Sequence, residues 1–240
     1  MINIDAKGLD FTALNEAIRE QDCDLEITNC LGQRFIASGM SRRKIRIKGT
    51  PGNALGAYLN GGEIYVDGNA QDAVGDTMNE GYIVVDGNIG DAAGYAMRGG
   101  KIYVRGNAGY RAGIHMKEYK EKVPVMIIGG KAGSFLGEYQ AGGKIIVLGL
   151  CDDGKPNVSN FPCTGMLGGK MYLRSVCKVL RLPDKVKVSR ATEGDMLEIS
   201  EYLTEYCNIF GLDMEEILSS EFTVIVPDTK NPYKQMYVAN

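Results

Sequence analysis

The chain of 240 residues is long enough for one large domain, or for one domain with extensions. Its 27 basic and 30 acidic residues give a net charge of -3, which argues against the basic stripe of a nucleic-acid-binding protein. Glycine is frequent at 32 residues, yet only 7 residues are proline and 44% are hydrophobic, so the glycines indicate a repeated structure and not disorder.

The N-terminal segment, residues 1–24, is expected to hold a strand and a helix. Phe11, Leu14 and Ile18 recur at helical spacing, and the helix would cap the first repeated unit, which begins near Leu25. The segment shows no signal peptide, and no apolar run in the chain reaches the length of a membrane span. The six cysteines are scattered without a Cys-x-x-Cys pair, as is typical of free thiols. We expect a cytoplasmic protein that binds no membrane.

A glycine-punctuated unit repeats through residues 25–182. Six glycines follow its apolar segments at intervals of 19, 19, 19, 24 and 19 residues: Gly49, Gly68, Gly87, Gly106, Gly130 and Gly149. A second glycine column follows seven residues later in five units: Gly56, Gly75, Gly94, Gly113 and Gly137. The longer interval results from an insertion at Lys117–Pro124. Such a period is typical of a solenoid, in which each unit buries its apolar face against the next.

Two alternating apolar columns precede the first glycines. One is Ile45, Ile64, Ile83, Ile102, Met126 and Ile145, and the other is Ile47, Val66, Val85, Val104, Ile128 and Val147. Period-two alternation of β-branched residues indicates a short strand in each unit. The fold class is therefore predicted as an all-β solenoid, a right-handed parallel β-helix of about seven coils that is roughly 30 Å long. Asn69, Asn88 and Asn107 are expected to form a short amide ladder, interrupted at Thr50 and Lys131.

The glycines carry no nucleotide-binding signature. Gly100-Lys101, Gly130-Lys131 and Gly169-Lys170 lack the following Ser or Thr of a Walker motif, and no Gly-x-Gly pair exists. We interpret the glycines as corners of the coil, where a positive φ is needed. The outward strand positions also form no reactive cluster, and their partly apolar and aromatic character suits contact with a protein. They are Arg46, Tyr65, Val84, Tyr103, Ile127 and Ile146.

Three polar features allow chemistry, but each has a simpler interpretation that we favour. His115, the single histidine, is either a general base or an outward-facing side chain. Asp152-Asp153 is either an acid–base pair or part of a solvated loop, and Arg42-Arg43-Lys44 is either an anion contact or a charged coil edge. No catalytic, cofactor-binding or metal-ligating residue is predicted. The insertions at Lys117–Pro124 and Leu150–Pro162 are either docking surfaces or neutral loop growth.

The C-terminal segment, residues 183–240, is predicted to be a small helical extension. Thr192 and Asp195 form an N-terminal capping signal, and Gly211 ends the helix. One helix face is apolar, with Met196, Ile199, Leu203, Tyr206 and Phe210. A short helix at Met214–Leu218 and a strand at Phe222–Pro227 are expected to follow, and the polar, aromatic tail beyond them is expected to contact another protein.

The units "GNAQDAVGDTMNEGYIVV", "GNIGDAAGYAMRGGKIYVRG" and "KAGSFLGEYQAGGKIIVLG" resemble the C-terminal glycine-repeat (GXGXG) β-helix domain of the glutamate synthase large subunit. The resemblance covers about Leu25 to Arg174, and "FTVIVPDTKNPYKQMY" resembles the end of free-standing versions of this domain. It implies a non-catalytic subunit that bridges a glutamine amidotransferase and a synthase subunit holding FMN and iron–sulfur clusters. This chain has neither an N-terminal cysteine nucleophile nor an iron–sulfur cysteine run, so we expect no cofactor in it. A homo-oligomer is possible when the chain is isolated.

Two alternatives remain open. The repeat also resembles one subunit of formylmethanofuran dehydrogenase, although the extension from Thr192 favours the glutamate synthase side. A stand-alone β-helix enzyme would need acidic or basic residues clustered on one strand face, and the outward positions show none.

Overall fold

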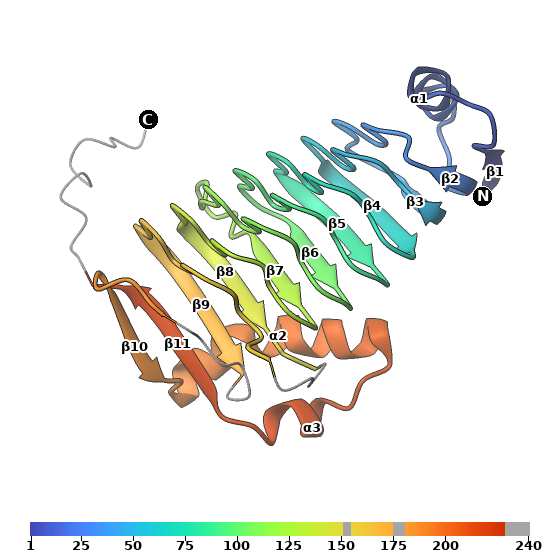
Figure 1. Ribbon diagram of the computed structural model, residues 1–240. Helices are drawn as coiled ribbons and strands as arrows, with labels where there is room; N and C mark the ends of the chain where they lie inside the picture. The colour runs from blue at the N-terminus through green and yellow to red at the C-terminus, as the bar shows by residue number, and fades with distance from the viewer. Residues whose placement is uncertain (151–154, 175–180, 229–240) are drawn as a thin grey trace.

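The nine consecutive strands β1 to β9 stack in chain order and form a parallel β-solenoid, as predicted (Figure 1). The computed structural model describes residues 1–150, 155–174 and 181–228. The stacked strands are β1 (Ile2–Asp5), β2 (Leu25–Leu31), β3 (Lys44–Thr50), β4 (Asn60–Asp67), β5 (Glu80–Val85), β6 (Lys101–Val104), β7 (Val125–Ile128), β8 (Ala141–Val147) and β9 (Gly168–Arg174). They make about eight turns, close to the expected seven.

The predicted apolar columns are superposed in the structure. Ile64 pairs with Ile83, Ile83 with Ile102, and Ile102 with Met126, each in direct register across neighbouring strands. All four side chains are completely buried. Like residues therefore pile into one continuous core along the axis of the solenoid, which confirms the interpretation of the repeat.

A polar ladder runs along one edge of the coils, where sequence analysis expected asparagines to stack. Asn69 Oδ1 accepts the backbone N–H of Asn88 at 2.8 Å, and Asn88 Oδ1 accepts that of Asn107 at 2.7 Å. Asn107 Oδ1 accepts the backbone N–H of Lys131 at 2.7 Å. The ladder thus extends as far as the backbone of Lys131, because the acceptor needs only a backbone N–H in the next coil and not a second amide.

A second corner recurs along the solenoid, between residues 35 and 165. In each of these coils it contains three residues with positive φ at alternate positions. In one coil these are Ala54, Gly56 and Tyr58, with φ of 63°, 64° and 57°. The middle residue faces the core, and in this coil it is glycine, which avoids placing a Cβ 2.7 Å from Ile83 Cδ1. The same position is Ala37 in an earlier coil and Cys163 in a later one, and both are buried with a positive φ. Tyr58 has a similar φ, and its side chain is exposed to solvent. The second glycine column thus marks a corner position that combines a positive φ with close packing against the core.

Gly81→Ala is expected to destabilise the solenoid by several kcal/mol. Gly81 has a φ of +102°, and an added Cβ would lie 2.3 Å from the backbone oxygen of Gly62 in the preceding coil. Gly211 also has a positive φ, of +65°, but nothing lies within 4 Å of its Cβ position. Gly211→Ala should therefore cost only the backbone strain of about 1–3 kcal/mol. Chemical unfolding of both variants measures the difference, and equal losses would show that the coils do not press together at Gly81.

The N-terminal end carries the expected strand and helix. β1 pairs in parallel with β2, and helix α1 (Phe11–Arg19) begins after the N-cap Asp10. Leu14 and Ile18 are buried in the main core, as the helical spacing predicted. Phe11 instead remains partly exposed, with its ring 6.1 Å from that of Phe35.

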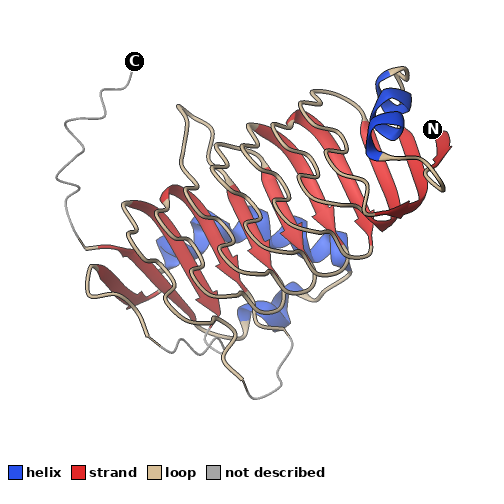
Figure 2. Cartoon of the chain, turned by 45° about the horizontal axis from the view of Figure 1, so that its top comes forward, coloured by secondary structure: helices blue, strands red, loops and turns tan. Residues whose placement is uncertain are grey.

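The C-terminal extension has the predicted helices and strand, and it returns to the solenoid. Helix α2 (Glu193–Phe210) begins with a complete capping box between Thr192 and Asp195 and ends at Gly211 in the left-handed conformation. Helix α3 (Met214–Leu218) and strand β11 (Phe222–Pro227) follow. Strand β11 lies antiparallel between β9 and a strand that no sequence pattern predicted, β10 (Val186–Arg190). Figure 2 shows α2 behind the sheet and the turns of the coils in front of it.

Candidate protein interface

Helix α2 covers much of the outward strand face that sequence analysis assigned to contact with another protein. Val84, Tyr103, Ile127 and Ile146 are buried, and they form a second apolar cluster with residues of α2. The helix contributes Ile199, Leu203, Tyr206, Cys207 and Phe210 to this cluster. The prediction of a separate protein on this part of the face was wrong, because the chain supplies its own cover.

A polar cluster fixes the middle of α2 to the sheet. The Glu205 carboxylate accepts hydrogen bonds from the Tyr103 hydroxyl at 2.7 Å, from the Tyr82 hydroxyl at 3.0 Å and from Lys101 Nζ at 2.7 Å. Burial alone would raise the pKa of Glu205, but the bonds from Lys101, Tyr103 and Tyr82 outweigh it, so its pKa is lowered. The carboxylate therefore stays charged against its ammonium partner. Lys101, which belongs to a Gly-Lys pair, serves as a helix anchor and not as a phosphate ligand.

A second ion pair fixes the beginning of α2. Lys170 Nζ lies 2.9 Å from Asp195 Oδ1 and 2.7 Å from Glu198 Oε1. Hydrogen bonds from Lys170 and from Thr192 lower the pKa of Asp195 to about 2. Lys170 also follows a glycine in the sequence, so the lysines of two Gly-Lys pairs, Lys101 and Lys170, hold the same helix.

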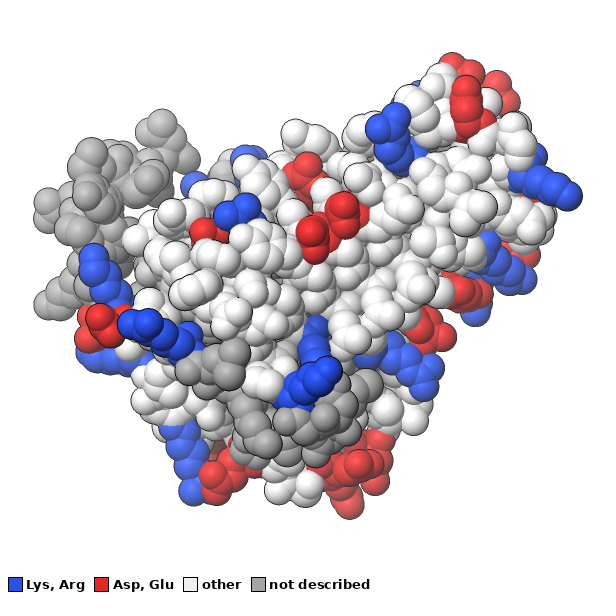
Figure 3. Space-filling view, in the orientation of Figure 1, with Lys and Arg blue, Asp and Glu red and all other residues white. Residues whose placement is uncertain are grey.

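The strand face beyond the reach of α2 is charged and solvated. Arg46 Nε lies 2.8 Å from Asp67 Oδ2, and Lys48 Nζ lies 2.7 Å from Glu26 Oε1. Figure 3 shows basic and acidic side chains intermixed along the edge of the molecule beside β2 to β5. Lys44 of the predicted basic run belongs to this edge, with Nζ 3.1 Å from Glu63 Oε2. Exposed pairs of this kind contribute little stability, so this face is interpreted as a solvated surface.

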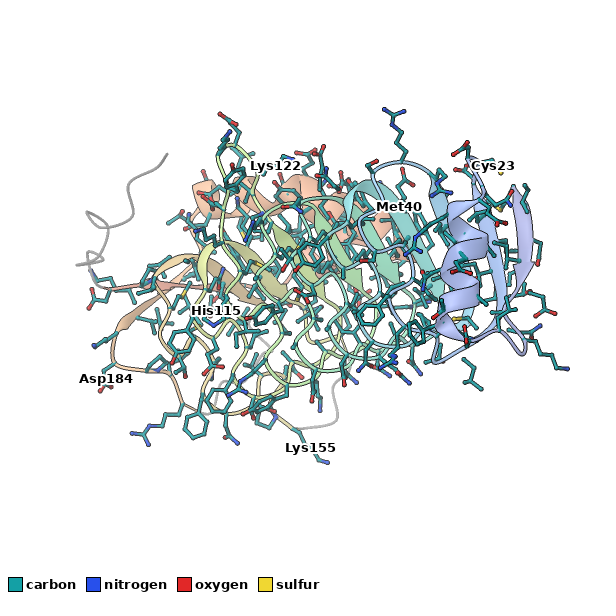
Figure 4. All side chains as sticks on the ribbon, turned by 90° about the horizontal axis from the view of Figure 1, so that it is seen from above. Cys23, Met40, His115, Lys122, Lys155 and Asp184 are labelled. Atoms are coloured by element: carbon teal, nitrogen blue, oxygen red, sulfur yellow. The ribbon has the colours of Figure 1, made fainter. Side chains whose placement is uncertain are left out.

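The turns on the other side of the solenoid expose two columns of aromatic rings. The Tyr95 and His115 rings lie edge to face at 5.9 Å, and His115 stacks on Tyr139 at 5.2 Å. In the second column, the Tyr110 and Phe135 rings lie at 5.3 Å, and the Phe135 and Phe161 rings at 5.2 Å. Figure 4 shows His115 on the side of the solenoid away from α2. The rings of each column belong to successive coils. They come into contact because the turns of neighbouring coils lie directly above one another.

Arg111 packs against the second aromatic column. Its Nε lies 2.7 Å from Oε2 of the buried Glu138, and its guanidinium lies 4.8 Å from the Tyr110 ring and 5.4 Å from the Phe135 ring. We call this surface the aromatic turn face and define it as Tyr95, Tyr110, Arg111, His115, Phe135, Tyr139 and Phe161. Ordered aromatic and arginine side chains are the types enriched at the centre of protein interfaces. Sequence analysis missed this face, because its residues share no periodic signature beyond their distance from the glycines.

The histidine, the acidic pair and the two insertions that sequence analysis singled out do not come together in one site among the described residues. His115 is exposed, and its imidazole ring packs against the Tyr95 and Tyr139 rings. The insertion at Lys117–Pro124 forms a small hairpin in which Tyr119 and Lys122 pair, and Lys122 reaches Glu80 at 2.7 Å. Asp152-Asp153 lies outside the described residues. The later part of the Leu150–Pro162 insertion supplies Phe161 to the aromatic turn face.

The buried thiols are poorly suited to nucleophilic chemistry. Burial raises the pKa of the Cys163 thiol to about 12 and that of Cys30 to about 11, so both stay protonated at neutral pH. Within residues 1–150, 155–174 and 181–228, no three His, Cys, Asp or Glu side chains are grouped so as to hold a metal ion. No helix in these ranges is long and apolar enough to span a bilayer.

Comparison with known proteins agrees with the repeat and the fold. The GXGXG motif family matches residues 19–230. The chain is also similar to "Uncharacterized protein MJ1350" of Methanocaldococcus jannaschii, with 42% identity over 248 residues, 98% of this chain and 95% of that protein. Because the family match includes both the solenoid and most of the extension that α2 anchors to it, the chain belongs to the GXGXG motif family.

Proposed function

We propose that this protein is a non-catalytic assembly subunit of a glutamate synthase-like complex. It would bridge a glutamine amidotransferase subunit and a synthase subunit. The observation that carries the proposal is the GXGXG motif match over residues 19–230. The completely buried core supports a scaffold role, because stacked Ile, Val and Met side chains fill the interior of the coils.

The aromatic turn face is the surface that we assign to one of the two partner subunits. It is the side of the solenoid that α2 leaves open, and its rings are held in fixed positions by stacking and by the Arg111–Glu138 pair. A preordered surface loses little conformational entropy when a partner binds. The charged strand face is a poorer candidate, since its ion pairs would have to be desolvated.

The chemistry would belong to the partners. In this proposal the amidotransferase subunit releases ammonia from glutamine, and the synthase subunit holds FMN and iron–sulfur clusters and reductively aminates 2-oxoglutarate. This chain would contribute no cofactor ligand, and its task would be to hold the two subunits in one arrangement.

Affinity purification of the full chain from native cells tests the role. We expect an amidotransferase and an FMN-containing synthase to copurify, and glutamine-dependent glutamate formation to require the chain when the purified subunits are recombined. An isolated monomer with turnover of its own would contradict the proposal.

A pair of variants tests the surface separately. Tyr139→Glu combined with Phe161→Glu places two charges on the aromatic turn face and should weaken partner binding at least ~30-fold, the scale of an interface hot spot. The control Leu197→Glu changes an exposed apolar residue on α2, on the opposite side, and should bind normally. Equal binding by both variants would reject this surface and leave the assembly role to be judged by copurification.

A further inference from the structure

A cavity of about 590 Å³ lies between α1 and the turns that follow β2. Three arginines line it, Arg19, Arg42 and Arg43, against a single carboxylate from Asp22. Ser38 and Ser41 add hydroxyl groups to the wall. Figure 4 shows Met40, another lining residue, beside α1 at this end of the molecule. The proposed assembly role makes no use of this cavity.

One of the three arginines has a structural task. The Arg43 guanidinium donates to the backbone carbonyl of Ile18 at 3.0 Å and also to that of Gln21. The Ile18 carbonyl belongs to the last turn of α1 and the Gln21 carbonyl follows the helix, in the region where helix carbonyls need partners from outside the helix. Arg43 therefore holds the helix against the coil and forms one wall of the cavity.

The other two arginines are unpaired. Several other guanidinium groups meet carboxylates closely, as Arg46 does with Asp67 at 2.8 Å and Arg105 with Asp86 at 2.9 Å. In the described part of the chain, the side chains of Arg19 and Arg42 make no hydrogen bond or ion pair. Two unpaired guanidinium groups that line the same cavity, in a chain of net charge -3, are a local excess of positive charge.

Asn15 gives the cavity a rigid polar wall. This side chain is only 7% exposed, and its Nδ2 donates to the backbone carbonyls of Phe11 at 2.7 Å and Arg34 at 2.9 Å. Asn15, Arg19 and Ser38 also line a neighbouring cavity of about 330 Å³ that includes Phe11 and Phe35. The polar cavity lined by the arginines therefore adjoins a second cavity that is lined by two aromatic rings.

We infer that this cavity binds a small metabolite through a phosphate or carboxylate group. Arg19 and Arg42 would bind the oxyanion, since the planar guanidinium matches both groups with two parallel hydrogen bonds. The volume falls within the range of small-molecule sites. The Phe11 and Phe35 rings would contact an apolar or planar part of the same ligand.

Isothermal titration calorimetry of the full chain tests the inference with three probes: inorganic phosphate, succinate and AMP. The ionic strength is held constant with chloride, so that general screening does not change. We expect saturable binding of at least one probe, with a Kd of about 1 mM or lower. Phosphate and succinate distinguish the two oxyanions, and tighter binding of AMP than of phosphate would indicate a contribution from the aromatic rings.

The matched variants are Arg19→Gln combined with Arg42→Gln, and the control Arg98→Gln. Arg43 is left unchanged because it holds α1. The double variant should weaken binding at least ~10-fold, whereas Arg98→Gln, which changes another exposed and unpaired arginine, should leave the affinity unaltered. Arg19→Lys with Arg42→Lys keeps the charge and should give an intermediate affinity. Unchanged thermal unfolding verifies that each variant is folded.

Two results would overturn the inference. One is the absence of saturable binding for all three probes at millimolar concentration. The other is an equal loss of affinity in Arg98→Gln and in the double variant, because that would show general attraction of anions to the surface and not a site.

Discussion

Val85→Asp is expected to abolish the folded solenoid. Val85 is 0% exposed and lies in register between Val66 in the preceding coil and Val104 in the next. An isolated carboxylate at this point would lose its hydration and find only apolar side chains around it. The cost is several kcal/mol, comparable with the total stability of about 5–15 kcal/mol of an ordinary domain. Circular dichroism during urea unfolding measures the effect.

Val188→Asp is the matched control. It makes the same chemical change on β10, where Val188 is 51% exposed, and should shift stability by no more than about 0.5 kcal/mol. A Val85→Asp protein with an unchanged unfolding midpoint would mean that the second apolar column is not a core column. The whole assignment of the repeat would then be wrong.

The stacking of the coils was predictable because residues separated by one repeat in the sequence contact one another in neighbouring coils. Ile64, Ile83 and Ile102 are 19 residues apart, and the structure pairs them directly. A residue's neighbours are therefore its own counterparts in the next units. The positive φ of Ala54 and Tyr58 could not be predicted in this way, since alanine and tyrosine carry no sequence signal for the left-handed conformation.

The position of α2 on the sheet could not be predicted from the sequence repeat. The sequence showed an apolar helix face and, separately, outward strand residues such as Tyr103 that needed cover. It did not show that these two surfaces meet, because Lys101 and Glu205 are 104 residues apart and neither belongs to a motif. An apolar surface is equally well covered by a partner or by the chain itself. The aromatic turn face was missed for a related reason, since its rings come together only when the turns are stacked.

Leu203→Asp is expected to release α2 from the sheet and leave the solenoid folded. Leu203 is 0% exposed within the cluster that includes Tyr103, Ile127 and Ile146. Replacing a buried leucine even by alanine costs about 2–5 kcal/mol, and a buried charge costs more. The main core consists of the inward columns on the other side of the strands, so it should persist. Hydrogen exchange should show loss of protection in α2 with retained protection in β5 to β8.

Leu197→Asp is the control within the same helix. Leu197 is 77% exposed, so this variant should keep α2 protected and should resist proteolysis like the unchanged protein. Leu203→Asp should in contrast be cleaved within α2 and should bind an apolar dye through the uncovered strand face. Loss of protection throughout the sheet would contradict the expectation. It would show that the helix and the solenoid unfold as one unit, and that the outward apolar residues are as necessary to the fold as the columns inside the coils.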